Sequence, residues 1–236
     1  MGGLRLRYLI LDLDDTLYPR RSGVMDLVNQ RIGRYMVERL GFPPEQAEAL
    51  RQRYYAQYGT ALRGLMEEHR IDPEDYLVYV HDIPLEVILQ PDPALDAMLA
   101  RLPLTKVIFT NASEEHARRV LERLGVARHF PIILDVRRLD YFNKPDPEAY
   151  WRILQHLRAQ GPECVFVDDS PRNLQPARAL GMITILVDGD ATDGVDFHVP
   201  NILGIEPVIL RLVQERNGDR EERPWLRSGH PPDLQE

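Results

Sequence analysis

The chain has 236 residues, of which 44% are hydrophobic and 28% are charged, a composition typical of a globular protein with one large domain or a core domain with an insertion. The net charge of -8 argues against a nucleic-acid polymer or an anionic membrane as a partner, but it allows a small phosphorylated ligand. No segment is long and apolar enough to cross a bilayer, and the N-terminus lacks an apolar signal core. The single cysteine, Cys164, lies in an apolar run and is expected in a buried strand, so we predict a cytoplasmic protein without an internal disulfide.

The first predicted strand, residues 7–12, is largely apolar, and acidic residues stand at its carboxyl end. In the stretch LDLDDTLYP, three carboxylates (Asp12, Asp14 and Asp15) come within four positions of Leu11. Carboxylates are seldom buried unless a partner neutralises them. A buried strand that ends in this way therefore indicates a metal or phosphate site.

Residues 20–90 contain no convincing strand and are predicted to be all-helical. Apolar residues recur every three or four positions from Met25 to Leu40 and again from Ala47 to Tyr58, and Asp72 precedes a third helix start. We expect this segment to be an insertion between the first strand and the rest of a sheet.

Strands and helices alternate along the remainder of the chain. The further predicted strands are 104–110, 131–136, 164–168 and 182–187, and the predicted helices are 113–124, 147–159 and 172–180. Short apolar strands separated by amphipathic helices are typical of an α/β fold with a doubly wound parallel sheet.

Polar residues follow four of the predicted strands, at the edge where an open α/β sheet binds its ligands. Thr110 and Asn111 follow the second strand, Lys144 comes after the third, and Asp168 and Asp169 end the fourth. Each alone is ordinary as a cap, a turn residue or a surface charge. Together with Asp12 and Asp14 they form a set of carboxylates that attracts Mg²⁺, and Lys144, Thr110 and Asn111 can surround a phosphoryl group.

Asp12 and Asp14 are predicted to have different roles in the reaction. Asp12, ionised, can attack phosphorus and form an aspartyl-phosphate. Asp14 can protonate the leaving alcohol and then deprotonate water, which requires a raised pKa. Asp15 is expected to point to the opposite side from Asp12 and Asp14, as a turn or metal-shell residue. Neither Cys164 nor any of the seven histidines is needed for this scheme.

Four motifs in this order, LDLDDTLYP, FTNAS, NKPDPEAY and FVDDSPRN, resemble those of the haloacid-dehalogenase-like hydrolase superfamily over roughly residues 7–212. The resemblance implies that Asp12 is the nucleophile, Asp14 the general acid/base, Thr110 and Lys144 phosphate ligands, and Asp169, with Asp168 beside it, the acidic Mg²⁺ site. It also implies that the backbone carbonyl of Asp14 binds the metal, and that residues 20–90 form a cap over a core made of 1–19 and 91–215.

Within that superfamily the chain is most similar to the pyrimidine 5'-nucleotidases, through DLDDTLYP, YGTALRGL and YFNKPDPEAYWRIL. The resemblance implies release of phosphate from nucleoside monophosphates such as UMP and CMP, with Tyr58 and Arg63 as candidate cap contacts. Other readings are a phosphatase, phosphotransferase or phosphomutase for another small phosphate ester, a 2-haloacid dehalogenase, and a receiver-like signalling protein. The oligomeric state is not predicted, and residues 216–236 are expected to be a disordered tail.

Overall fold

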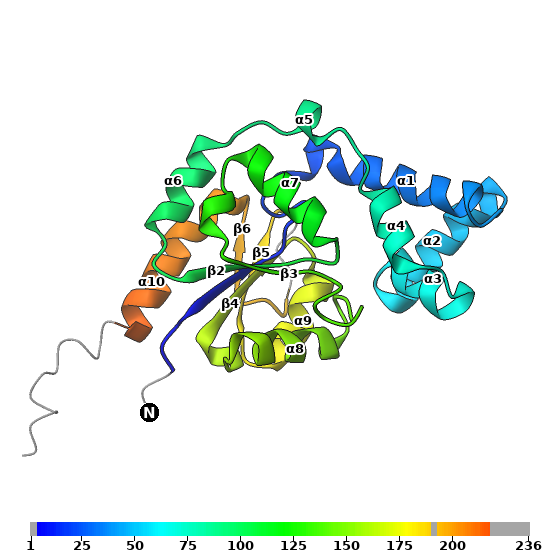
Figure 1. Cartoon of the computed structure of the whole chain (residues 1–236). Coiled ribbons are helices and arrows are strands. Elements are labelled where there is room, and N and C mark those ends of the chain that lie inside the picture. Colours follow the sequence, from blue (N-terminus) through cyan, green and yellow to red (C-terminus); the bar gives the residue numbers. More distant parts are fainter. Residues whose placement is uncertain (1–3, 190–192, 218–236) are drawn as a thin grey trace, which may run out of the picture.

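The computed structural model describes residues 4–189 and 193–217, and within them the chain forms one six-stranded sheet (Figure 1). All pairings are parallel, and the strand order is β3-β2-β1-β4-β5-β6. The strands are β1 (Tyr8–Leu11), β2 (Thr105–Phe109), β3 (Ile132–Leu134), β4 (Cys164–Asp168), β5 (Ile183–Val187) and β6 (Phe197–Val199). The predicted doubly wound α/β fold is confirmed.

The sheet is buried on both faces, which explains why its strands are apolar without alternation. Successive side chains of a strand point to opposite faces, so Leu9 and Leu11 belong to one hydrophobic cluster and Ile10 to another. Figure 1 shows α6 (Pro93–Arg101), α7 (Glu114–Leu124) and α10 (Ile205–Asn217) over one face, and α8 (Pro147–Leu157) and α9 (Pro171–Ala179) over the other.

The helices on the sheet begin where their sequences indicate. The Ser113 side chain accepts a hydrogen bond from the His116 backbone N–H at the start of α7, and the Asp146 side chain accepts one from Glu148 N–H at the start of α8. Cys164 is a buried strand residue, as predicted. Strand β6 was not predicted, because three residues with exposed His198 at their centre carry no apolar pattern.

Residues 20–90 contain helices and no strand, all of them described residues: α1 (Val24–Glu38), α2 (Pro44–Tyr58), α3 (Ala61–His69), α4 (Pro73–Val80) and α5 (Leu85–Ile88). The sequence pattern did not predict α3, which begins two residues after Gly59 ends α2 with a φ of 88°. Short 3₁₀ turns occupy Arg20–Ser22, Ala127–His129, Gly161–Glu163 and Ile202–Gly204.

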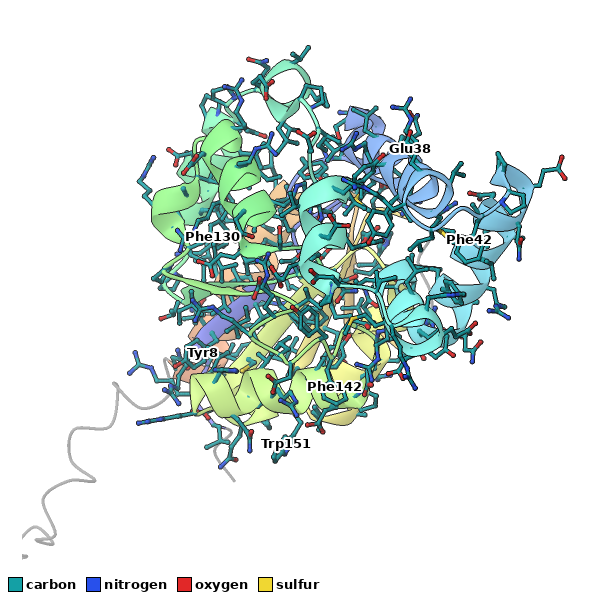
Figure 2. All side chains as sticks on the ribbon, turned by 45° about the vertical axis from the view of Figure 1, so that its right-hand side comes forward. Tyr8, Glu38, Phe42, Phe130, Phe142 and Trp151 are labelled. Carbon is teal, nitrogen blue, oxygen red and sulfur yellow. The ribbon has the colours of Figure 1, made fainter. Side chains whose placement is uncertain are left out.

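The helices α1–α4 pack around their own hydrophobic cluster, which includes Tyr35, Met36, Tyr54 and Leu65, and they lie beside the sheet rather than on either face (Figure 1). In Figure 2, Phe42 marks this helical unit, whereas Phe130 and Trp151 mark the two layers on the sheet. Val24 and Val28, near the start of α1, belong instead to the main cluster of the sheet. The helical unit is therefore anchored to the sheet by the first turns of α1.

The chain fills one half of the sheet from β1 to β3 and then crosses over to β4. The carboxyl ends of the neighbouring strands β1 and β4 are consequently the point where the two halves diverge, which is where such sheets bind ligands. No helix among the described residues is long and apolar enough to span a membrane. Most of the predicted tail lies outside the described residues, and its first two positions are the end of α10.

Candidate active site

Asp12, Lys144 and Asp168 meet at the carboxyl ends of β1 and β4. The Nζ atom of Lys144 lies 2.5 Å from Oδ1 of Asp12 and 2.8 Å from Oδ2 of Asp168. All three residues are buried. The register brings the two acids together, because Leu11 pairs with Val167 and each acid is the next residue in the chain. A buried ammonium between two carboxylates satisfies the charges that burial would otherwise penalise.

Asp169 joins these acids to form a cluster able to hold a cation. One oxygen each of Asp12, Asp168 and Asp169 lies within 4.8 Å of the others. Thr16 ties two of them together, because its hydroxyl donates to Asp12 Oδ2 (2.9 Å) and accepts from the Asp169 N–H (3.1 Å). Arg20, from the turn after β1, reaches Asp169 Oδ2 at 2.9 Å.

Electrostatics also favour a cation at this cluster. Burial, together with the charges of Asp168 and Asp14, raises the pKa of Asp12 to about 7 even though Lys144 opposes the shift. Burial and Asp12 likewise raise the pKa of Asp169. Lys144 and Arg20 supply two positive charges against the three carboxylates of Asp12, Asp168 and Asp169. Hard oxygen ligands are those that Mg²⁺ prefers. The donor set thus fits the predicted metal, which would supply positive charge against a phosphoryl group.

Asp15 lies at the edge of this cluster. Its Oδ1 atom is buried and has no hydrogen-bond partner among the described residues, while its other oxygen lies 3.4 Å from Arg20 Nε. Burial, followed by the charge of Asp169, raises its pKa to about 7. The residue has a φ of 60°, which only a few residue types adopt without strain. This tight turn directs Asp14 and Asp15 to different surroundings.

Asp14 does not join the acidic cluster with its side chain. Its Oδ1 accepts hydrogen bonds from His116 Nε2 (2.9 Å) and the Tyr18 hydroxyl (2.5 Å). Burial tends to raise the pKa of Asp14, but His116 and Tyr18 outweigh it and hold the pKa below its ordinary value. The sequence led us to expect a raised pKa, and the structure differs because no neighbouring carboxylate outweighs these two donors.

Thr110 and Asn111 follow β2 and lie beside Lys144 at the same cavity. The Thr110 hydroxyl accepts from the Ala112 N–H (3.0 Å), which leaves its own hydrogen available to a ligand. Asn111 instead uses both ends of its amide on the lysine: Oδ1 accepts from the Lys144 N–H (2.8 Å) and Nδ2 donates to its carbonyl (3.1 Å). The Asn111 side chain therefore fixes the loop that carries Lys144.

Asn173 and His116 are site residues that the sequence reasoning missed. Asn173 Nδ2 donates to Asp168 Oδ1 at 2.9 Å. The predicted reaction scheme uses no histidine and therefore does not include His116. The sequence does contain evidence for His116 as a site residue. It lies in the first turn of α7, the helix that follows β2, and it is buried together with Ala117 and Val120.

A cavity of about 850 Å³ lies between the acidic cluster and helices α1–α4. Its helical wall combines apolar side chains with the polar residues Asn29, Arg51, Tyr55 and Tyr76. The candidate cap contacts Tyr58 and Arg63 are not among the lining residues: their side chains pair with Glu68 and Glu67. Gly59, Thr60 and Ala61, between α2 and α3, do line the cavity.

A doubly wound parallel sheet with a lysine and an acidic cluster at its switch point defines the class as an α/β enzyme fold. A family described as haloacid dehalogenase-like hydrolase matches residues 6–181, and the chain belongs to this family. The predicted superfamily is thereby confirmed.

Two relatives and one solved structure illustrate the similarity. The chain is 30% identical over 191 residues to "Phosphate metabolism protein 8" of Saccharomyces cerevisiae, a match covering 75% of this chain but only 60% of the yeast protein. It is 28% identical to "Phosphoglycolate phosphatase" of Neisseria gonorrhoeae, over 89% of this chain and 94% of that protein. The crystal structure of an HAD phosphatase from Thermococcus onnurineus shares the fold with a TM-score of 0.60 at 17% identity, covering 86% of this chain and 98% of the other.

Proposed function

We propose that the protein is a Mg²⁺-dependent phosphomonoester hydrolase that works through an aspartyl-phosphate. The observation that carries this proposal is the contact of Lys144 with both Asp12 and Asp168 at the floor of the cavity. A carboxylate beside a buried ammonium and a cation site is suited to attack a phosphoryl group whose charge is neutralised on several sides. The relative named phosphoglycolate phosphatase supports the same reaction type.

In this proposal each residue has one task. Asp12 attacks phosphorus, and Lys144 with Thr110 binds the phosphoryl oxygens. Asn111 supports them by fixing the Lys144 loop. Asp12, Asp168, Asp169 and the backbone carbonyl of Asp14 would hold Mg²⁺, which when bound supplies positive charge to the phosphate.

Asp14 is the proposed general acid and base. Its Oδ2 has no hydrogen bond within the described part of the chain, and Asp14 lines the cavity, so this oxygen is free to face a leaving group. Because His116 and Tyr18 lower its pKa, protonation depends on the phosphorylated or substrate-bound state, in which nearby negative charge increases.

For the substrate we propose a nucleoside monophosphate such as UMP or CMP. The cavity has the size of pockets that enclose whole small molecules, and a two-carbon ester would fill only part of it. The apolar wall with Asn29, Arg51 and Tyr76 suits a flat ring that carries hydrogen-bonding groups. We also propose that α1–α4 act as the cap and that the protein works in the cytoplasm, for which the unpaired, buried Cys164 is the support.

The alternative of a 2-haloacid dehalogenase fits these residues less well, because displacement of halide from carbon needs neither a cation site nor an acid for an oxygen leaving group. A phosphotransferase or phosphomutase shares the first half of the proposed reaction. It differs only in whether water or a second substrate takes the phosphoryl group.

The experiment is phosphate release from UMP, CMP, AMP, sugar phosphates, phosphoglycolate and p-nitrophenyl phosphate, with Mg²⁺ and with EDTA. We expect metal-dependent release that is fastest from UMP and CMP. Faster release from another ester would keep the reaction and refute the nucleotide proposal. No release from any ester by folded protein would refute the phosphatase proposal.

A further inference from the structure

The proposed acid, Asp14, is held by a histidine that the reaction scheme does not use. His116 Nε2 lies 2.9 Å from Asp14 Oδ1, and the side chain of His116 is fully buried. The same oxygen accepts a hydrogen bond from the Tyr18 hydroxyl, whereas Oδ2 has no hydrogen bond among the described residues, and Asp14 lines the cavity. The two donors thus select which carboxylate oxygen of Asp14 is presented.

The surroundings of His116 fix both its ring position and its tautomer. The ring stacks on His81 with centroids 4.4 Å apart and an interplanar angle of 24°. Its backbone N–H is bound to the Ser113 side chain, which also contacts His81 Nδ1 at 3.2 Å. The Nδ1 atom of His116 is buried with no partner among the described residues. A proton on Nδ1 would be a buried donor without an acceptor, so the proton belongs on Nε2, where it is donated to Asp14.

His81 completes this arrangement as a neutral, apolar surface for the ring. Burial lowers the pKa of His81 to about 3. His81 is therefore neutral at neutral pH, and the stack places no positive charge of His81 beside Asp14. Ser113 holds His81 through Nδ1, and His81 in turn stacks on the ring of His116.

We infer that His116 is a positioning residue that holds Oδ1 of Asp14 so that Oδ2 faces the leaving group of the substrate. This inference rests on the proposed function, because it assigns His116 a part in the acid step of that reaction. Without the Nε2 donor, Tyr18 alone restrains the carboxylate, which can then rotate away from the leaving oxygen. Loss of a correctly placed acid is felt most by esters whose leaving groups need a proton.

The test compares one substitution that removes the N–H donor with another that keeps a donor. His116→Phe keeps a planar ring for the stack on His81 and removes the donor, whereas His116→Gln keeps an N–H near the position of Nε2. For each we would measure kcat with UMP, a poor leaving group, and with p-nitrophenyl phosphate, which needs little protonation. General acid catalysis contributes about 10²- to 10⁴-fold, so we expect His116→Phe to lower kcat for UMP by about 10- to 100-fold more than for the aryl ester, and His116→Gln to restore most of it.

A matched control is available in His129, whose Nε2 lies 2.8 Å from Asp96 Oδ1 away from the cavity lining. His129→Phe removes a similar histidine–carboxylate contact and should leave the ratio of the two kcat values unchanged. Equal losses for both esters in His116→Phe, or full activity, would overturn the inference.

A crystal structure of the His116→Phe protein tests the inference without activity. We expect the Asp14 carboxylate to change its rotamer or to become disordered, and an unchanged carboxylate would also overturn the inference. If the wild-type protein released no phosphate from any ester, the proposed function would fail by itself, and this structure would still decide whether His116 orients Asp14.

Discussion

The 2.5 Å contact between Lys144 Nζ and Asp12 Oδ1 joins two residues that are 132 positions apart in the chain. Lys144 is one of only two lysines in a chain rich in arginine, and it is buried. An ammonium is a compact point charge, so it can approach two carboxylates at once where the planar fork of arginine would need more room. The contact places a positive charge beside Asp12 and opposes the rise in its pKa that burial causes.

Replacing Asp12 by Asn should therefore remove the proposed nucleophile while changing the shape of the site very little. We expect kcat for UMP to fall by at least about 10³-fold. The protein should stay folded, because Lys144 keeps its contact with Asp168. Steady-state kinetics and circular dichroism test this, with Asp82→Asn on an exposed acid as the control. Near-normal turnover would contradict the assignment of Asp12.

Mg²⁺ should stabilise the protein by binding to the acidic cluster. A ligand at 100 times its Kd adds about 2.7 kcal/mol, and about 2–4 °C in Tm accompanies each kcal/mol for a chain of this size. We expect Mg²⁺ to raise the Tm of the EDTA-treated protein by about 5–10 °C and the Asp169→Asn variant to show a smaller rise. Asp188→Asn alters an acid outside the cluster and should behave as wild type. An unchanged response in Asp169→Asn would argue against this metal site.

Asp15 should make the metal-free protein less stable as the pH rises. Its pKa is raised to about 7 from 3.8 by burial first and by Asp169 second. Between these two values the folded protein binds more protons than the unfolded chain, so the free energy of unfolding falls as the pH increases. Asp15→Asn removes this effect, and Asn tolerates the φ of 60° at this position.

We therefore expect Asp15→Asn to match wild type only below the ordinary pKa of 3.8, and to become increasingly more stable than wild type as the pH rises to about 7 in EDTA, as measured by urea unfolding. The gain will be smaller than the full pKa shift would give, because solvent screens this partly exposed group. His81 titrates in the opposite direction, but it is present in both proteins and cancels in the comparison. Equal pH dependence in the two proteins would contradict this reading.

The helical wall of the cavity should set the affinity for the substrate. Arg51 Nη1 donates to Asn29 Oδ1 at 3.0 Å, which fixes the Asn29 amide beside the cavity. We expect Arg51→Met to raise KM for UMP by about tenfold, equivalent to about 1.4 kcal/mol, and to leave p-nitrophenyl phosphate almost unaffected. Arg53→Met, on the same helix but outside the cavity lining, is the matched control. Equal effects on both esters would refute this role for Arg51.

Gly59 couples the helical unit to the loop that carries Lys144. A Cβ atom at this position would lie 2.6 Å from both Asn143 Nδ2 and the Lys144 carbonyl oxygen, and the φ is 88°. We expect Gly59→Ala to reduce kcat by about tenfold or more and to lower stability beyond the 1–2 kcal/mol, roughly, that a left-handed φ costs alanine. Gly41→Ala shares the positive φ but has no atom within 4 Å of the added Cβ. If both variants lost the same stability and kept activity, the close approach of Gly59 to the Lys144 loop would not be important for function.

The sequence by itself determined strands β1 to β5 and the identity of the polar residues around the switch point, but not β6 or the order of the strands. Apolar runs followed by Asp12, Thr110 and Asp168 can be read locally, because a buried strand and its polar end are contiguous in the chain. Helix starts at Ser113 and Asp146 were equally local, since a cap binds N–H groups only two or three residues away.

Only the tertiary structure decided how these residues are paired. The pKa of Asp14 depends on His116, 102 positions further on, and no spacing rule predicts a contact of that range. The composition of the cavity wall depends in the same way on how α1 and α2 pack. The predicted contacts Tyr58 and Arg63 do not line the cavity, whereas Asn29 and Arg51 do. Local patterns fix which side chains stand at the end of an element, whereas the pairing of side chains from separate elements is set by packing.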